Sequence, residues 1–272
     1  MPLGSSGPDF ETFRLSKEAA KMTAPRLPKR VFLMRHAQST YNEIIRNPNT
    51  WMTPSFWFDG FDPGEKHRDA RINSEGERQI KMMRDTLPKN VLEECQLFVC
   101  SPLSRTCQTA IGVTKDRING RQIVAHPALR EVARSTCDLG RPVIELKKEF
   151  GSFVNFDLLG KEEWWRAEGA PEAPRFYREE PQEIVTARVQ EFLKWLAQRD
   201  ESNVFVFSHA YTIQELTKMP KFGNCGVVEM TLEYKDGTDQ KELEKKIDQQ
   251  NLKSTKNRRP NHKIRFEIVK FY

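Results

Sequence analysis

The chain contains four short, almost wholly apolar runs, which are separated by longer segments of mixed polarity. Runs of three to five apolar residues between polar boundaries are typical of buried β-strands. The predicted strands are 30–34, 97–100, 122–125 and 204–207.

The segments between these runs have the periodicity of helices that bury one face. In 181–199, for example, apolar residues such as Val185, Val189 and Phe192 recur at spacings of three or four. Ser74 and Glu77 have the spacing of a capping box, which predicts a helix that begins there and ends near Leu87. The predicted helices are 39–46, 74–87, 103–115, 181–199 and 210–219.

Two β-rich segments, 226–234 and 263–271, end the chain and are joined by a polar link, which predicts an antiparallel hairpin. Upstream of them, strands alternate with helices. Such alternation indicates an α/β fold with helices on both faces of the sheet. We therefore expect a three-layer α/β/α fold, with a mostly parallel central sheet and the C-terminal hairpin at its edge.

The chain is expected to form an N-terminal extension, 1–28, and a single catalytic domain, 29–272. Insertions are expected at about 47–71 and 147–173, and a basic polar excursion at about 235–262. Aromatic residues crowd 51–61, where they either bind an apolar substrate or fill a small core of the insertion's own.

The composition narrows the class of protein. Of the 272 residues, 38% are hydrophobic, which is enough for a packed core, yet no run approaches the 18 apolar residues of a membrane span. Residues 1–14 lack the apolar core of a secretory signal. The five cysteines are odd in number and form no C-x-x-C pair, which favours reduced thiols in a cytoplasmic protein and no metal centre or disulfide.

The net charge of +6 is located at the end of the chain. Residues 241–272 hold ten lysines and arginines against four acids, and 253–265 hold six without any acid. Such a stretch suits nucleic acid or acidic lipid. Since no nucleic-acid motif accompanies it, a solvated loop is the favoured interpretation, and nucleic acid is not the expected partner.

Polar residues follow three of the predicted strands. Arg35–His36 ends the first, Ser101 and then Arg105 follow the second, and Ser208–His209 ends the fourth. Ligands of open α/β sheets bind beyond the carboxyl ends of the strands, so these side chains are expected to converge. Two imidazoles and two guanidinium groups around one point suit a phosphoryl group, whose oxygens carry the negative charge.

Five segments resemble, in order, the motifs of the histidine phosphatase (phosphoglycerate-mutase-like) superfamily, branch 1, over about 30–232. They are 32–42 with Arg35-His36-Ala37, 69–76 (D-x-x-L-T-x-x-G in the family), 100–110 (S-P-L-x-R-x-x-Q-T-A), 129–131 (L-x-E) and 206–210.

The resemblance implies a role for each matching residue. His36 would be the nucleophile and become phosphohistidine. The residues that would bind the transferring group are Arg35, Arg105 and His209, with further hydrogen bonds from Ser39 and Asn42. Glu131 would protonate the leaving oxygen and then activate water. Asp138 and Glu145 stay open as alternatives to it. Neither a metal nor another cofactor is implied.

Two departures from the family pattern bear on activity. Ala37 stands where Gly is usual, and Ala does not readily adopt a positive φ. The E-R-H-Y-G stretch that follows the acid in phosphoglycerate mutases is missing after Glu131.

The second departure favours a phosphomonoesterase acting on a small phosphorylated molecule or a phosphoprotein. A phosphoglycerate mutase or sugar bisphosphatase, and a weakly active scaffold that binds partners through the basic excursion, are the alternatives. The sequence leaves the oligomeric state open, including a homodimer.

Overall fold

The computed structural model describes residues 27–47, 64–118, 120–165, 180–234 and 264–271; for 234 and 264–271 the backbone alone is described. Its strands are β1 (Lys29–Arg35), β2 (Leu97–Cys100), β3 (Ile123–Ala125), β4 (Val154–Asn155), β5 (Asn203–Ser208), β6 (Val227–Tyr234) and β7 (Ile264–Phe271). The aromatic stretch 51–61 and the excursion 235–262 lie outside the described residues.

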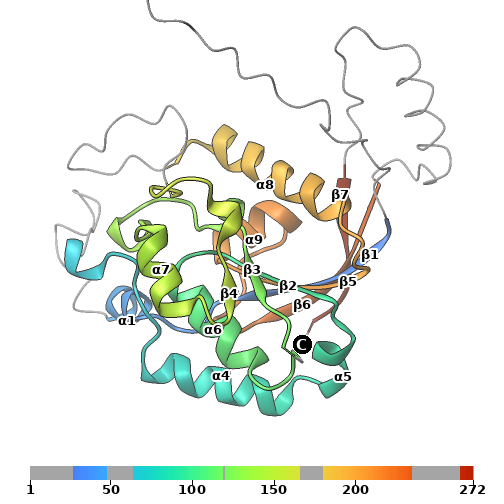
Figure 1. Ribbon diagram of the computed structural model, residues 1–272, viewed down its shortest axis with the longest axis horizontal. Coiled ribbons are helices and arrows are strands. Elements are labelled where there is room, and N and C mark those ends of the chain that lie inside the picture. Colours follow the sequence, from blue (N-terminus) through green and yellow to red (C-terminus); the bar gives the residue numbers. More distant parts are fainter. Residues whose placement is uncertain (1–26, 48–63, 119, 166–179, 235–263, 272) are drawn as a thin grey trace, which may run out of the picture.

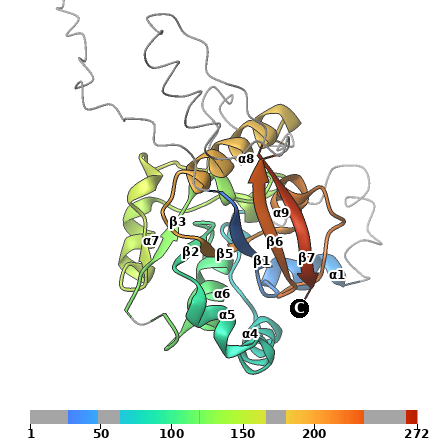
Figure 2. The same cartoon turned by 90° about the vertical axis from the view of Figure 1, so that its right-hand side faces the viewer.

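The described strands form one sheet in the order β4-β3-β2-β5-β1-β6-β7. The first five strands in this order pair in parallel, and β6 pairs antiparallel with both β1 and β7. Figure 2 shows β6 and β7 together at one edge of the sheet. The expected sheet, mostly parallel with an antiparallel C-terminal hairpin at its edge, is confirmed.

Helices cover both faces of this sheet (Figure 1). They are α1 (Thr40–Arg46), α4 (Ser74–Thr86), α5 (Lys89–Glu94), α6 (Ser104–Thr114), α7 (Val143–Phe150), α8 (Gln182–Ala197) and α9 (Ala210–Thr217), with short 3-10 turns at 65–67, 127–129, 136–138 and 157–159.

Successive residues of β1 serve the two faces alternately, as the pleat of a strand requires. Phe32 and Met34 join the core cluster that includes residues of α4 and α6, whereas Val31 and Leu33 join the cluster that includes residues of α8 and α9. All four are fully buried. The near-continuous apolar run of β1 thus reflects burial on both sides, and the three-layer prediction is confirmed.

The predicted start of the helix at Ser74 is confirmed, but its N-cap is Asn73 and not Ser74. Asn73 caps α4, because its side-chain oxygen accepts a hydrogen bond from Gly76 N at 2.9 Å. The Asn73 N–H donates to Gln38 O, and a β-bridge joins Ile72 to Ser39. These bonds keep the backbone extended through Asn73, so Ser74 becomes the first helical residue and not the cap.

The expected insertion at 147–173 begins within α7 and supplies β4, the edge strand opposite the hairpin. Trp164 and Trp165, near the end of its described part, are buried in the core cluster of the α4 and α6 face. Residues 166–173 lie outside the described residues.

All five cysteines are free and buried, in agreement with the predicted thiols. Within the described ranges, every helix is too short or too polar to cross a bilayer.

Candidate active site

The carboxyl ends of β1, β2 and β5 meet at one edge of the sheet. Arg35 lies opposite Ser208 in the pairing of β1 with β5, and Cys100 lies opposite Phe207 in the pairing of β2 with β5. The ladder continues one residue further, since His36 N donates to Ser208 O and Ser101 N donates to Phe207 O, both at 3.0 Å. The expected convergence of the three strand ends is therefore present.

His36 is buried, with 3% of its surface exposed. Its Nδ1 lies 2.7 Å from the carbonyl oxygen of Ala37. A carbonyl only accepts, so Nδ1 carries the proton and Nε2 keeps its lone pair. Burial, together with the positive charges of Arg105 and Arg35, lowers the pKa of His36 well below its usual range. The imidazole is thus neutral and oriented, as a nucleophile must be.

His209 lies beside His36, with ring centroids 5.0 Å apart. Its Nε2 contacts the hydroxyls of Ser101 at 2.8 Å and Thr106 at 3.1 Å. Its Nδ1 is buried and has no hydrogen-bond partner. Burial, then the charge of Arg105, lowers the pKa of His209. A buried nitrogen without a partner is costly, and an oxyanion beside His36 would supply the missing acceptor.

Arg35 is the second group with an unsatisfied nitrogen. Its Nη1 donates to the carbonyl of Phe222 at 2.8 Å, while its Nε is buried without a partner. Burial lowers the pKa of Arg35. The structure thus places a desolvated cation next to His36.

Arg105, in the first turn of α6, is held differently. Its two terminal nitrogens donate to Cys137 O at 2.7 Å and to the Asp138 carboxylate at 2.9 Å. Asp138 is buried and also accepts from the backbone N–H of Arg134 and Ser135. This pairing orients Arg105. It also shows why Asp138 is poorly placed as a general acid, because its oxygens already accept hydrogen bonds from Arg105 and from the backbone of Arg134 and Ser135.

Glu131 lies at the same edge and is buried. Its two oxygens accept from Val132 N at 2.9 Å and Tyr211 N at 3.4 Å. Burial, followed by the negative charge of Asp138, raises the pKa of Glu131. Glu145 differs, because its side chain is exposed and pairs with Arg141. Of the three candidate carboxylates, Glu131 has the environment of a general acid.

Ser39 and Asn42 form the capping box of α1. The Ser39 hydroxyl accepts from Asn42 N, and the Asn42 side-chain oxygen accepts from Ser39 N, both at 3.2 Å. Both bonds use the side chains as acceptors. The expected role of Ser39 and Asn42 as hydrogen-bond donors to phosphate therefore stays a prediction. The capping box fixes the positions of both side chains.

Ala37 is accommodated without strain. It is fully buried, and its N–H donates to the hydroxyl of Thr109 at 3.0 Å. It does not belong to the residues with positive φ. This position therefore does not need the positive φ that Gly would readily adopt.

The segment 69–76, which resembles D-x-x-L-T-x-x-G, contacts the first residue of α6 through Asp69. Asp69, at a φ of 48°, accepts from Ser104 N at 2.7 Å and from the Ser104 hydroxyl. Arg141 donates to the same carboxylate at 2.9 Å. Asp69 thus satisfies the first N–H of the helix that carries Arg105 and Thr106.

The loop between α9 and β6, 218–226, contributes contacts to this edge that the sequence did not predict. Asn224 donates to His36 O at 2.9 Å and to the Asn42 side chain at 3.2 Å, and it accepts from Arg46 at 2.8 Å. The carbonyl of Phe222 holds Arg35. The loop has no motif among those quoted, so only its tertiary position identifies these residues.

The five residues Arg35, His36, Arg105, Glu131 and His209, here called the His36 cluster, combine a buried imidazole of lowered pKa, two guanidinium groups, a second imidazole and a protonatable carboxyl. This set can bind a phosphoryl group, attack it and protonate a leaving oxygen.

Known proteins of one superfamily are similar to this chain. A model of the histidine phosphatase superfamily (branch 1) matches residues 31–219. Two Arabidopsis thaliana proteins, phosphoglycerate mutase-like protein 1 and phosphoglycerate mutase-like protein, are 24% and 26% identical to the chain, with 67% of the chain covered in each case and 68% and 71% of the relatives. The solved structure of a mycobacterial glucosyl-3-phosphoglycerate phosphatase with VO3 is 19% identical, with a TM-score of 0.47, 89% of this chain covered and 97% of that chain. Because the family model spans more than half of its length, the chain belongs to the histidine phosphatase superfamily, branch 1.

Proposed function

We propose that this protein is a phosphomonoesterase that works through a phosphohistidine at His36 and needs no metal. The observation that carries the proposal is the environment of His36. The ring is buried and held by the Nδ1 contact to Ala37 O, and burial together with Arg105 and Arg35 lowers its pKa. Arg35, Arg105 and His209 supply the positive charge and donors that a metal supplies in other phosphatases.

Hydrolysis would take two displacements. Nε2 of His36 attacks phosphorus in line with the leaving oxygen, the P–O bond breaks, and Glu131 gives that oxygen a proton. Water then attacks the phosphohistidine, Glu131 takes a proton from the water, and the P–N bond breaks to release phosphate. The raised pKa of Glu131 suits a group that serves as acid first and as base second.

The segment after Glu131 favours hydrolysis over mutase chemistry. It runs Val132-Ala133-Arg134-Ser135 in place of the E-R-H-Y-G of phosphoglycerate mutases. The two plant relatives carry mutase-like names, which keeps a mutase as the alternative. A coupled assay with phosphoglycerates separates the two activities.

The test is turnover of p-nitrophenyl phosphate with and without EDTA. We expect turnover that EDTA leaves unchanged, an acid-labile phosphoenzyme after rapid quenching with ³²P-labelled substrate, and loss of roughly 10⁴-fold or more in kcat for His36→Gln. The matched control is His126→Gln, because His126 is also buried but packs against Phe192 and Trp195 on the α8 side. Full turnover by His36→Gln would exclude the mechanism.

The role of Glu131 has its own readout. A p-nitrophenolate departs without protonation, whereas the poorer leaving group of phenyl phosphate needs a proton. Glu131→Gln should therefore lower the rate of phenyl phosphate hydrolysis more than that of p-nitrophenyl phosphate hydrolysis, with the two losses differing by roughly 10²-fold or more. Equal losses on the two esters would assign Glu131 a role other than general acid.

A further inference from the structure

Two hydroxyl groups converge on one ring nitrogen of His209. The Oγ of Ser101 lies 2.8 Å from Nε2, and the Oγ1 of Thr106 lies 3.1 Å from it. Ser101 follows β2, Thr106 lies in the first turn of α6, and His209 is the N-cap of α9. All three residues are fully buried, so each hydroxyl proton needs an acceptor within the protein.

The hydroxyl of Thr106 differs from the two other threonine hydroxyls of α6. Thr109 and Thr114 each donate to the carbonyl of the residue four positions earlier, at 2.7 Å, which is a common bond of helical threonines. Among the described residues, the Thr106 hydroxyl contacts only Nε2 of His209. The acceptor open to its proton is therefore the lone pair of that nitrogen.

The hydroxyl of Ser101 is in the same position. Its oxygen already accepts a hydrogen bond from Leu103 N at 3.3 Å, but its proton still needs an acceptor. Within the described part of the chain, the acceptor in reach of that proton is again Nε2 of His209.

The count of hydrogen bonds differs between the two neutral forms of His209. A proton on Nε2 would leave both hydroxyl protons without an acceptor among the described residues. A proton on Nδ1 leaves a lone pair on Nε2, which accepts at least one of them. Burial and the charge of Arg105 lower the pKa of His209, so the ring carries a single proton and takes one of these forms.

We propose that Ser101 and Thr106 are positioning residues that hold the proton of His209 on Nδ1, so that this nitrogen donates to an oxyanion of the substrate. Nδ1 is buried and has no partner in the described residues, as such a donor requires. His36 is also protonated at Nδ1, through Ala37 O, but keeps Nε2 free. The two imidazoles thus share one tautomer and present opposite nitrogens, a lone pair on His36 and an N–H on His209. The inference rests on the proposed function for the anion, whereas the tautomer is a property of the protein without ligand.

The tautomer can be observed directly. The full chain, labelled with ¹⁵N-histidine and free of ligand, is measured by long-range ¹H–¹⁵N correlation, which separates protonated from unprotonated ring nitrogens. His209→Gln identifies the signals of His209. We expect the wild-type ring to carry its proton on Nδ1. A wild-type ring protonated at Nε2, alone or together with Nδ1, would overturn the inference, and this measurement does not depend on any variant being stable.

Two double variants separate the hydroxyl of Thr106 from its packing. Both contain Ser101→Ala. Thr106→Val then keeps the shape of the side chain without the hydroxyl, whereas Thr106→Ser keeps the hydroxyl without the methyl group. In the valine variant we expect Nδ1 to be protonated in about a third of the molecules or fewer. The Kd for vanadate, measured by calorimetry, should rise in inverse proportion, by about threefold or more. The serine variant should keep the wild-type tautomer.

Thr114→Val is the matched control, because it removes another buried hydroxyl of α6 that bonds only within the helix. It should change neither the tautomer nor the Kd for vanadate. A valine double variant that keeps the proton on Nδ1 would overturn the role of the two hydroxyls. A changed tautomer with an unchanged Kd would overturn the role of Nδ1 as the donor.

Failure of this inference is distinguishable from failure of the proposed function. If the protein hydrolyses p-nitrophenyl phosphate while His209 is protonated at Nε2, the positioning role is wrong and the phosphatase stands. If the proton lies on Nδ1 and depends on the two hydroxyls, but no ester is hydrolysed, the positioning role stands and the proposed reaction is wrong.

Discussion

Two groups of buried charges are neighbours in the chain and differ in how completely they are paired. One is the His36 cluster. The other, called the Glu180 network, consists of Arg130, Glu180 and Arg188, all less than a tenth exposed. Arg188 donates to both oxygens of Glu180 and to the carbonyls of Ala128 and Arg130. Arg130 donates to Glu180 and to the carbonyl of Trp165.

The network leaves no buried side-chain nitrogen without a partner, whereas the His36 cluster leaves two, Arg35 Nε and His209 Nδ1. Arg188 donates to carbonyls of the segment that precedes Glu131, so the network fixes where that carboxyl lies. A satisfied network stabilises one conformation. The unsatisfied cluster has polar groups in excess of the contacts that the fold supplies, as expected of groups that bind an anion.

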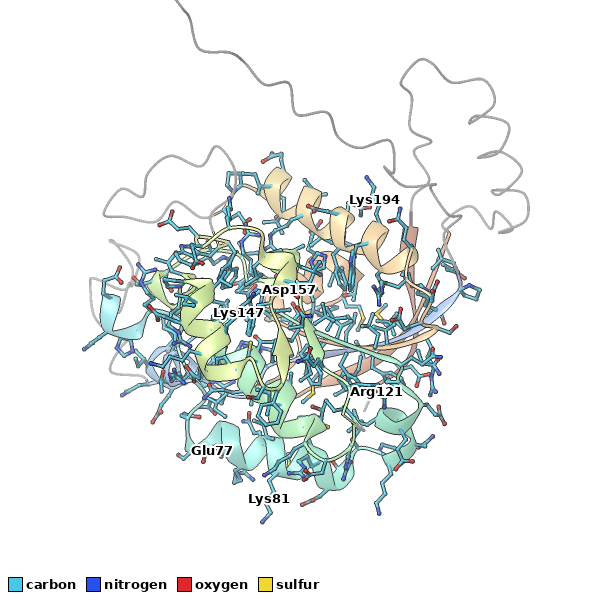
Figure 3. All side chains as sticks on the ribbon, in the orientation of Figure 1. Glu77, Lys81, Arg121, Lys147, Asp157 and Lys194 are labelled. Carbon is cyan, nitrogen blue, oxygen red and sulfur yellow. The ribbon has the colours of Figure 1, made fainter. Side chains whose placement is uncertain are left out.

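The largest expected effect comes from breaking the network. Glu180→Gln removes its carboxylate and leaves two buried guanidinium groups without a counter-charge. The free energy of unfolding should fall by about 3–5 kcal/mol, measured by urea denaturation. Glu77→Gln, at an exposed residue of α4 (Figure 3), is the matched control and should change stability by less than about 0.5 kcal/mol. A loss for Glu180→Gln no greater than the control's would show that the two arginines do not depend on this carboxylate.

An intermediate effect, on activity, is expected within the His36 cluster. His209→Gln removes the unpartnered Nδ1, while its amide takes the place of Nε2 beside the hydroxyls of Ser101 and Thr106. It should lower kcat/KM for p-nitrophenyl phosphate by roughly 10²–10³-fold. Vanadate should bind correspondingly more weakly. Because Nδ1 has no partner in the fold and the glutamine amide keeps a polar atom beside the two hydroxyls, the substitution should cost little stability. A large drop in stability without a loss of vanadate affinity would show that His209 stabilises the fold, as the Glu180 network does, and does not bind the anion.

The His36 cluster was more predictable from sequence than the network. Val31–Met34 and Val204–Phe207 are apolar because both faces of the central strands are buried, so the strand ends are visible in the sequence. Their carboxyl ends must meet at one edge of a parallel sheet, and this predicts that His36 and His209 lie close together although 172 residues separate them in the sequence. The residues of the His36 cluster could therefore be predicted from the ends of the strands and from the family's motifs.

The residues that position the cluster were not predictable in this way. Asp138 pairs with Arg105, and Asn224 holds His36 O, through contacts of irregular segments whose paths no periodicity specifies. The short elements α5 and β4 were missed for a related reason, since six and two residues are too few to display a period. The capping error at Ser74 arose because a bridge to another segment extends the backbone by one residue.

The smallest expected effect is a change in pH dependence that tests how the cluster's carboxylates interact. Asp138→Asn keeps an acceptor for Arg105 but removes the negative charge that raises the pKa of Glu131. Arg105, no longer neutralised, then also favours ionised Glu131, so both changes lower that pKa. Because the acid must be protonated, the alkaline limb of kcat/KM for phenyl phosphate should move to lower pH.

Asp157→Asn serves as the control for this shift, because Asp157 is an exposed carboxylate paired with Lys147 (Figure 3). Its profile should match that of the wild-type protein. An alkaline limb that stays in place in Asp138→Asn, or moves to higher pH, would mean that Glu131 does not donate the proton or that Asp138 does not act on it. A shift to lower pH in Asp138→Asn alone would identify the Asp138–Arg105 pair as the group that sets the acidity of Glu131, and would distinguish it from the Glu180 network, which fixes where Glu131 lies.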